Sequence, residues 1–425
     1  MKILVIGSGG REHALCWKLR QSPRVEKVWC APGNGGISLD AECVPADVKD
    51  VSALADLAQK LGADLTVVGP ELPLVLGVVD EFEKRGLKIV GPSKAAARLE
   101  GSKVFAKQFM ERHGIPTAPV YAIHDSAGEA YSALCAVDWP CVIKADGLAA
   151  GKGVLVAPDP DTATAFIDHL MEQRLYGDAG SQVLLEEALE GEELSYIVLT
   201  DGQHILPMVP TRDHKRVFDG NKGPNTGGMG AYSDDSLLPE PLAQQIRSTI
   251  VEPAIRGLAA EGMPYKGFLY FGLMLTSDGP KVLEFNCRMG DPEAQAVIAR
   301  MDFDLAEALD AVASGKLANV KPAWKPGASV CVVIASGGYP GDFETGKPIT
   351  GLEAAAKTGA VVFHAGTSRD GDKFVTSGGR VLGVTACGET LSMSLRVSYD
   401  ACSNIAFERA HYRSDIAKPQ AAAAC

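Results

Sequence analysis

The sequence predicts an α/β protein with three parts: an N-terminal parallel-sheet domain, a larger α/β unit in the middle and a small C-terminal α+β domain. The chain has 425 residues, more than a single domain usually holds. Short apolar runs alternate with amphipathic stretches through the first part of the chain, an order typical of parallel strands joined by crossover helices. The final part instead combines strand-like runs, several glycine turns and one helix-like stretch.

The composition is that of an ordinary globular protein, with 46% hydrophobic and 22% charged residues. The net charge of −12 argues against a nucleic-acid partner, because general nucleic-acid binders carry an excess of basic residues. The ten cysteines form no C-x-x-C pair, which favours reduced core thiols over a zinc or redox site. No apolar run approaches the ~18 residues of a membrane span, and a glycine turn comes too early for a signal peptide. We therefore expect a cytoplasmic protein with no membrane partner, and a monomer by default.

In the N-terminal part, strands are expected at residues 3–6, 25–30, 65–68 and 88–90, with helices at 13–21, 54–60 and 74–84. The first turn, residues 7–13, resembles the G-x-G-x-x-G dinucleotide fingerprint, but Glu12 stands where the third glycine belongs. The second strand ends near Cys30 without the acid that would bind a ribose, so NAD binding is not expected. Two interpretations stay open: an anion at the start of the first helix, or turn glycines with no ligand.

The centre of the chain, residues 141–154, predicts a strand, a loop of small residues and a second strand. Lys144 lies in the first apolar run, and Gly147, Gly151, Lys152 and Gly153 follow it. Glycines let a backbone approach a polyphosphate closely, and lysines add positive charge for phosphate oxygens. A Walker A loop is excluded, because three residues separate Gly147 from Gly151 and a glycine follows Lys152.

The remaining elements are expected on either side of this loop. Ser102 is expected to cap a helix over residues 103–112, and residues 267–276 and 281–286 form a hairpin around Asp278 and Gly279. The polar, glycine-rich passage 211–232 is too long for a simple connection, so it is either functional or disordered. Residues 321–327 form a linker. Strands at 329–335, 360–364 and 380–386 and a helix at 391–405 complete the chain.

Two acidic segments complete the candidate site. A strand end at residues 186–189 offers a backbone that can pair with an adenine edge, and Glu193 lies where a carboxylate can accept hydrogen bonds from ribose hydroxyls. Glu284 and Asn286 are alternate residues on one face of a strand, so a carboxylate and an amide oxygen lie side by side, as Mg²⁺ with ATP phosphates prefers. Each signal is weak alone, and their order along the chain carries the prediction.

That order resembles the ATP-grasp superfamily, and more closely the phosphoribosylamine–glycine ligase family within it. The matching motifs lie at residues 7–14 (GSGGREHA), 68–71 (VGPE), 144–153 (KADGLAAGKG), 213–216 (DHKR), 223–232 (GPNTGGMGAY), 284–293 (EFNCRMGDPE), 336–341 (SGGYPG), 364–367 (HAGT) and 378–382 (GGRVL). The resemblance covers residues 1 to about 416. It implies a pre-ATP-grasp domain at 1–101, an ATP-grasp domain at 102–320 with an ATP-lid subdomain at about 123–193, and a C-terminal domain at 326–416.

The resemblance also implies a reaction: ATP-dependent ligation of glycine to 5-phosphoribosylamine through a glycyl phosphate, in purine synthesis, with Mg²⁺ or Mn²⁺. The implied ATP-binding residues are Lys103, Lys144, Gly151, Lys152, Gly153, Glu186, Glu187, Ala188, Leu189 and Glu193. The implied substrate-binding residues are Gly9, Gly10, Arg11, Asp213, Arg288, Gly290 and Asp291. Arg288 is expected to stabilise the transferring phosphoryl group and Asp213 to pair with the glycine ammonium or the substrate amine, while Glu284 and Asn286 bind the metal.

Several points are left open by the sequence. Lys215 and Arg216 are either site residues or solvated charges. Many ATP-grasp enzymes carry a second acid on the strand before E-x-N, but Gly272 is the nearest counterpart here. The rival functions are an ATP-grasp ligase for another amine, a nucleotide-sensing module without turnover, and a dehydrogenase. The 213–216 and 225–232 segments argue against the first, the intact 284–288 set against the second, and Glu12 against the third.

Overall fold

The computed structural model describes residues 1–149 and 153–418. Its N-terminal sheet has the order β3-β2-β1-β4-β5, and all its pairs are parallel, as predicted. The strands are β1 (Lys2–Gly7), β2 (Lys27–Pro32), β3 (Glu42–Cys43), β4 (Leu65–Val68) and β5 (Ile89–Val90). The helices α1 (Gly10–Leu19), α2 (Val51–Leu61), α3 (Glu71–Leu76) and α4 (Val78–Lys84) connect them.

The prediction of a single helix over residues 74–84 is wrong, because two helices, α3 and α4, occupy this region. Gly77 lies between α3 and α4 with a φ of +95°, a left-handed conformation that glycine adopts without steric cost. This residue therefore ends α3 and redirects the chain into α4. The helix expected over 103–112 is confirmed as α6 (Lys103–Arg112), and a short helix, α5 (Arg98–Gly101), precedes it. The Ser102 hydroxyl caps α6 by accepting a hydrogen bond from the Phe105 amide at 3.0 Å, as predicted.

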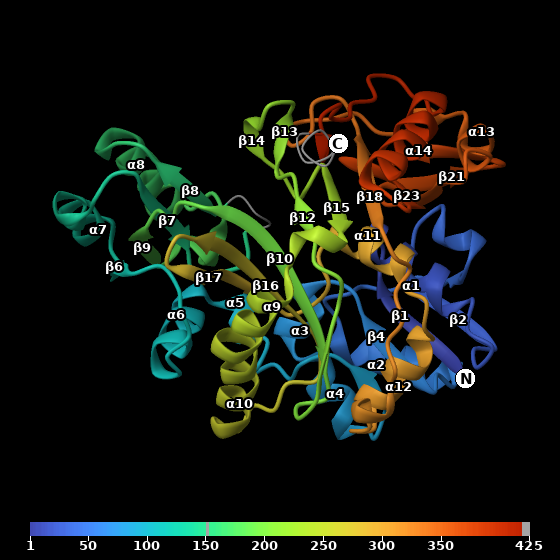
Figure 1. Ribbon diagram of the computed structural model, residues 1–425, viewed down its shortest axis with the longest axis horizontal. Helices are drawn as coiled ribbons and strands as arrows, with labels where there is room; N and C mark the ends of the chain where they lie inside the picture. Colours follow the sequence, from blue (N-terminus) through green and yellow to red (C-terminus); the bar gives the residue numbers. More distant parts are fainter. Residues whose placement is uncertain (150–152, 419–425) are drawn as a thin grey trace.

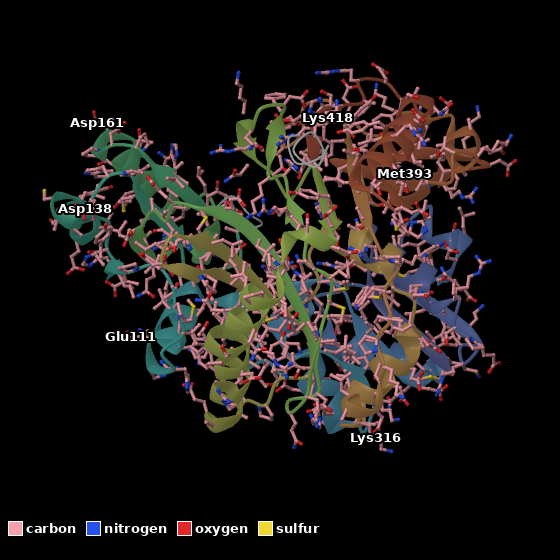
Figure 2. All side chains as sticks on the ribbon, in the orientation of Figure 1. Glu111, Asp138, Asp161, Lys316, Met393 and Lys418 are labelled. Carbon is pink, nitrogen blue, oxygen red and sulfur yellow. The ribbon has the colours of Figure 1, made fainter. Side chains whose placement is uncertain are left out.

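A separate antiparallel sheet of order β6-β9-β7-β8 lies at one end of the molecule (Figure 1). It consists of β6 (Val120–His124), β7 (Cys141–Ala145), β8 (Val154–Ala157) and β9 (Val183–Glu187). Two helices, α7 (Ala127–Ala133) and α8 (Pro160–Ile167), cover it, and their apolar residues form a core of their own with the strands. This sheet and its two helices are called the lid below, and in Figure 2 the labelled acids Asp138 and Asp161 lie on its outside.

A second four-stranded antiparallel sheet has the order β11-β10-β16-β17. Its strands are β10 (Glu192–Thr200), β11 (Ile205–Pro207), β16 (Gly267–Thr276) and β17 (Gly279–Asn286). The helices α9 (Glu240–Ile246) and α10 (Glu252–Ala260) come between β11 and β16 along the chain. The predicted hairpin is confirmed, because β16 pairs with β17 and Thr276 faces Gly279 across the turn. A bulge at Gly272 and Leu273 interrupts the register next to Glu284.

The C-terminal sheet, β12-β15-β18-β23-β20, combines segments from two parts of the chain. The strands β12 (Arg212–Asp213) and β15 (Gly230–Asp234) come from the glycine-rich passage, which is therefore ordered. The others are β18 (Ala328–Ala335), β20 (Val361–His364) and β23 (Arg380–Gly388), with α14 (Leu391–Asn404) packed on them. A small sheet of β19 (Pro348–Ile349), β22 (Lys373–Thr376) and β21 (Thr367–Asp370), the helix α13 (Leu352–Ala356) and the hairpin β13 (Arg216–Phe218)–β14 (Lys222–Asn225) lie beside it.

The helix α11 (Glu293–Arg300) joins the three parts of the molecule. It packs against α1 on one side and against β18 and β23 on the other (Figure 1). Gly10 makes the approach of α1 possible, because a Cβ there would lie 2.5 Å from the Gln295 side-chain nitrogen. The helix α12 (Leu305–Ala313) follows α11. Of the helices in the described ranges, none combines the length and the apolarity that crossing a bilayer requires.

Candidate active site

Glu186 lies between two buried lysines at the base of the lid. Its carboxylate forms one ion pair with Lys144 on β7 and another, at 2.6 Å, with Lys107 on α6. Lys144 Nζ also donates a hydrogen bond to the Leu283 carbonyl oxygen at 2.9 Å, which ties the lid to β17. Burial lowers the pKa of Lys107 to about 8, against the attraction of Glu186. The Glu186 side chain is thus the counter-charge of the lysines, while the adenine contact of the 186–189 backbone stays a prediction.

Glu284 and Asn286, the predicted metal ligands, lie on β17. Glu284 faces Gly272 of β16 and Asn286 faces Tyr270, so they alternate on one side of the strand. Burial alone would raise the pKa of Glu284, but the charges of Lys215, Lys103 and other cations outweigh it and hold that pKa below its ordinary value.

This pair fits a hard divalent cation. Within the described residues, the Glu284 carboxylate has no hydrogen bond or ion pair with another side chain, so its oxygens can accept a ligand. No cluster of three His, Cys, Asp or Glu side chains suited to a metal occurs in the part of the chain that the structure describes. An ionised carboxylate and an amide oxygen suit Mg²⁺ where phosphates and water complete the shell.

Lys103 lies at the first position of α6, beside the loop after β7. Its Nζ donates a hydrogen bond to the Gly147 carbonyl oxygen at 3.3 Å, and burial lowers its pKa. Asp146 fixes this junction, because its carboxylate accepts hydrogen bonds from the Val104 amide at 2.8 Å and from the Ser102 hydroxyl at 2.9 Å. The predicted loop residues Gly151 and Lys152 lie outside the described residues.

Asp213, Lys215 and Glu193 form a second charged group beside Glu284. Lys215 Nζ lies 2.5 Å from a Glu193 carboxylate oxygen and 3.9 Å from one of Asp213. Burial raises the pKa of Asp213 to about 7, although Lys215 opposes this. For Lys215, burial would lower the pKa, but Asp213 and Glu193 hold it well above its ordinary value. The structure therefore places Lys215 with the site residues, whereas Arg216 is exposed and hydrogen-bonds the Gly223 carbonyl oxygen at 2.8 Å.

A buried polar network that the sequence did not reveal lies behind Asp213. The Tyr270 hydroxyl donates to a Glu293 carboxylate oxygen at 3.0 Å, and Ser195 Oγ lies 2.7 Å from the same hydroxyl. Glu293 is 5% exposed. Its charge adds to the rise in the Asp213 pKa. These residues come from β10, β16 and α11, so only the fold brings them together.

Arg288 is held by two carboxylates from the N-terminal part of the chain. Its Nε lies 3.1 Å from a Glu71 oxygen, and its Nη2 lies 2.7 Å from a Glu100 oxygen. Burial would lower the pKa of Arg288, but Glu100 and Glu71 raise it above its ordinary value. Glu100 also accepts a hydrogen bond from the Cys287 amide at 2.6 Å. Arg288 is therefore a fixed, permanently charged group just after β17.

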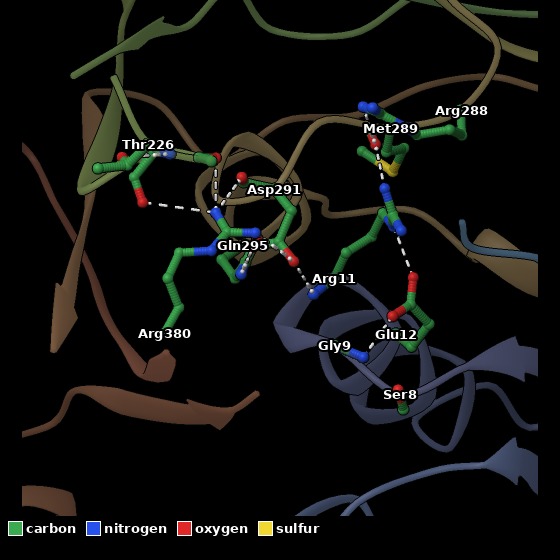
Figure 3. A network of polar contacts seen from close by, with 12 residues as sticks. Ser8, Gly9, Arg11, Glu12, Thr226, Arg288, Met289, Asp291, Gln295 and Arg380 are labelled. Carbon is green, nitrogen blue, oxygen red and sulfur yellow. Dashed lines mark hydrogen bonds and ion pairs between the residues drawn. The ribbon is translucent and has the colours of Figure 1, made fainter. Parts of the chain in front are cut away.

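At the turn between β1 and α1, the Glu12 side chain folds back onto the backbone of the turn (Figure 3). Glu12 accepts a hydrogen bond from the Gly9 amide at 2.5 Å and forms an ion pair with Arg11 Nε at 2.5 Å. Arg11 Nη1 donates to the Met289 carbonyl oxygen at 3.0 Å. The Glu12 side chain packs against Gly7, where a Cβ would lie 2.6 Å from it. This packing gives a physical reason for Glu12 in place of the third fingerprint glycine.

Asp291, another predicted substrate residue, connects α1 to the C-terminal sheet. Its Oδ1 accepts from Gln295 at 2.9 Å, and its Oδ2 lies 3.5 Å from both the Arg11 amide nitrogen and Arg380 Nη2 (Figure 3). Arg380 Nη1 also donates to the carbonyl oxygens of Asp291 at 2.5 Å and Gly227 at 2.6 Å. Arg380 lies in the 378–382 motif, but the sequence alone indicated no role for this residue.

This arrangement defines the class. The four-stranded antiparallel lid places Lys144 against β17, the strand that carries Glu284 and Asn286, and this is the architecture of an ATP-grasp protein. The biotin carboxylase of Campylobacter jejuni shows the same fold, with a TM-score of 0.72 at 16% identity over 97% of this chain and 92% of its own.

Comparison with known proteins identifies the family within this class. The phosphoribosylglycinamide synthetase models match in chain order: the N domain at residues 1–100, the ATP-grasp (A) domain at 101–294 and the C domain at 329–419. The phosphoribosylamine–glycine ligases of Allochromatium vinosum and Escherichia coli are 49% and 50% identical to this chain, over 98% of it and 98% of their own lengths. The crystal structure of the Thermotoga maritima ligase has a TM-score of 0.84 at 34% identity, covering 98% of this chain and 100% of its own. The chain belongs to the phosphoribosylglycinamide synthetase family.

Proposed function

We propose that this protein is a phosphoribosylamine–glycine ligase, which joins glycine to 5-phosphoribosylamine and converts ATP to ADP and phosphate in purine synthesis. The observation that carries the proposal is the convergence, at the mouth of the lid, of the Lys103 and Lys144 charges with Glu284 and Asn286. The full-length similarity to ligases of this name supports the choice of substrates.

The reaction needs two group transfers. A glycine carboxylate oxygen attacks the γ-phosphorus of ATP, the bond to ADP breaks, and glycyl phosphate forms. The amine nitrogen of phosphoribosylamine then attacks the glycyl carbonyl carbon, phosphate leaves, and the nitrogen loses a proton. Phosphorylation supplies the leaving group that a carboxylate lacks, so the protein needs no nucleophile of its own. Its task is to position the reactants and to stabilise developing charge.

The residues divide these tasks between them. Lys103, Lys144 and the 151–153 loop hold the ATP phosphates, the 186–189 backbone lines the adenine, and Glu193 faces the ribose. Glu284 and Asn286 would hold Mg²⁺ or Mn²⁺, which when bound neutralises phosphate charge. Arg288, fixed by Glu71 and Glu100, is placed to stabilise the transferring phosphoryl group.

Asp213 is proposed to face the reacting amine. It pairs with the glycine ammonium or with the amine of phosphoribosylamine, as its burial beside Lys215 and Glu193 allows. Gly9, Gly10, Arg11, Gly290 and Asp291 are proposed for the phosphoribosylamine side. The cytoplasmic location and the monomeric state stay predictions.

The test is phosphate release from MgATP with glycine and freshly generated phosphoribosylamine, added together or singly. Release that requires both substrates supports the ligase. Release with neither substrate, or only with a different amine, contradicts the substrate assignment and leaves an ATP-grasp ligase for another amine. ATP binding without any turnover would instead indicate a nucleotide sensor.

A further inference from the structure

A pocket of about 350 Å³ lies between the start of α1 and the C-terminal sheets. Its walls include Ser8, Asn34, Asp291, Thr367, Ser377 and Arg380. It therefore combines the first turn and the loop after β17, both of which the proposed function assigns to phosphoribosylamine, with residues of the C-terminal domain, to which that function assigns no role.

Arg380 is the cation in this wall. Both protons of its Nη1 are engaged, because this atom donates to the carbonyl oxygens of Gly227 at 2.6 Å and Asp291 at 2.5 Å. Its Nη2 has only a distant partner, the Asp291 carboxylate oxygen at 3.5 Å, and its Nε has none among the residues that the structure describes. The guanidinium is thus held rigidly on one side, while the N–H groups of Nε and Nη2 remain for a ligand. Two parallel N–H groups of this kind match two oxygens of a phosphate.

Arg11 does not offer the same fork. Its side chain is 8% exposed, and its Nε and Nη1 are directed to Glu12 and to the Met289 carbonyl oxygen. The Arg380 side chain is 22% exposed and lines the pocket. In Figure 3 the Arg380 guanidinium lies beside Asp291, whereas Arg11 points away toward Glu12 and Met289. The accessible positive charge here therefore comes from the C-terminal domain.

Neutral donors complete the pocket. The hydroxyls of Ser8 and Ser377 make no side-chain hydrogen bond within residues 1–149 and 153–418, and both line the cavity. Asp291 does not fill the Arg380 fork, because its Oδ1 accepts from Gln295 at 2.9 Å and its Oδ2 lies 3.5 Å from the Arg11 amide at the start of α1, as far as it lies from Arg380 Nη2. One rigid cation with hydroxyl groups around it suits a phosphate monoester.

We propose that this pocket binds the 5-phosphate of phosphoribosylamine and that Arg380 is the residue that recognises it. The inference rests on the proposed function for its ligand. It makes the C-terminal domain part of the active site. It also gives the enzyme a means to select a phosphorylated sugar amine over the bare sugar amine.

The first experiment compares wild type with Arg380→Gln and Arg380→Lys. Losing a charge-assisted fork costs roughly tenfold to hundredfold in affinity. We expect Arg380→Gln to raise the KM for phosphoribosylamine and the inhibition constant of ribose 5-phosphate by about that factor, with an intermediate value for Arg380→Lys. The KM values for ATP and glycine should stay within about twofold. Arg369→Gln is the matched control, because Arg369 lies in the same domain and stacks on Phe374 at 4.1 Å.

A purely structural role gives a different pattern. If Arg380 only fixes the Gly227 turn, the KM values for all three substrates rise together, or kcat falls while ribose 5-phosphate inhibits as before, and either result overturns the proposal. Ser377→Asp keeps Arg380 and adds a negative charge at an exposed position, so it tests the pocket even if the Arg380 variants do not fold. It should weaken ribose 5-phosphate selectively, and unchanged binding would overturn the proposal.

Calorimetric titration of ribose 5-phosphate tests the phosphate pocket separately from the proposed ligase activity. It requires no turnover, so it reports on the pocket even if the ligase assay fails. Binding to wild type that is lost in Arg380→Gln, with no binding of ribose, supports the phosphate site. Equal binding to wild type and Arg380→Gln, or none to either, overturns it. Failure of the ligation assay alone overturns only the substrate assignment.

Discussion

Replacing Glu186 with Gln should loosen the lid, because one carboxylate neutralises two buried lysines. Glu186 is 1% exposed, and the side chains of Lys107 and Lys144 are 5% and 7% exposed, so water cannot replace the lost charge. Removing one partner of a buried ion pair costs about 3–5 kcal/mol. The lower figure corresponds to a roughly 150-fold larger equilibrium constant for opening, and so to faster exchange by about that factor. Native-state hydrogen exchange measures this directly on peptides covering β7 and β9.

The neighbour on the same strand provides the control. Glu187 is half-buried and forms no ion pair among the described residues, so Glu187→Gln should change exchange by less than about 0.5 kcal/mol. Adding Lys107→Met to Glu186→Gln removes one orphaned charge and should restore part of the protection. Equal exchange in Glu186→Gln and Glu187→Gln would refute the argument that this carboxylate holds the lid strands to α6.

Three further outcomes are expected. Glu284→Gln should leave the thermal midpoint unchanged but reduce ADP formation at least 10²-fold, because the carboxylate proposed to hold the metal loses its charge. Near-normal turnover in a folded variant would contradict the metal assignment. Lys144→Ala should weaken ATP binding by roughly tenfold to hundredfold in a calorimetric titration, and unchanged affinity would contradict its role. Burial lowers the pKa of His364 to about 3 from 6.5, so only the unfolded state takes up this proton as the pH falls below 6.5. The wild type should therefore lose about 2 kcal/mol from this group at pH 5, and denaturation should show a smaller loss for His364→Gln.

Much of the fold could be predicted because its signals are local. Apolar runs and intervening amphipathic stretches indicated the N-terminal parallel sheet, and a two-residue turn indicated the β16–β17 hairpin. The two-residue strand β3 was not predicted, since it is too short to produce a periodic pattern. The break at Gly77 was also not predicted. The apolar spacing continues across this residue, but its left-handed backbone conformation ends the helix.

The candidate site divides in the same way. Lys144, Glu284 and Asn286 could be chosen because each stands at a recognisable place in a strand. The interactions between site residues could not be predicted, because they join distant parts of the chain. Arg288 hydrogen-bonds Glu71, 217 positions away, and Arg380 hydrogen-bonds the Asp291 carbonyl oxygen, 89 positions away. A short motif can mark a residue as a candidate, but only the fold shows which charged group lies beside it.

The distribution of counter-charges distinguishes the cations of this site. Lys144 shares Glu186 with Lys107, and Arg288 has two carboxylates of its own, so these cations are already compensated. Lys103 differs, since its Nζ has a carbonyl oxygen and no carboxylate within 4.0 Å in the described part of the chain. Burial also makes its charge costly, as its lowered pKa shows. We therefore expect a bound triphosphate to gain most from Lys103, and the paired cations to fix the geometry around it.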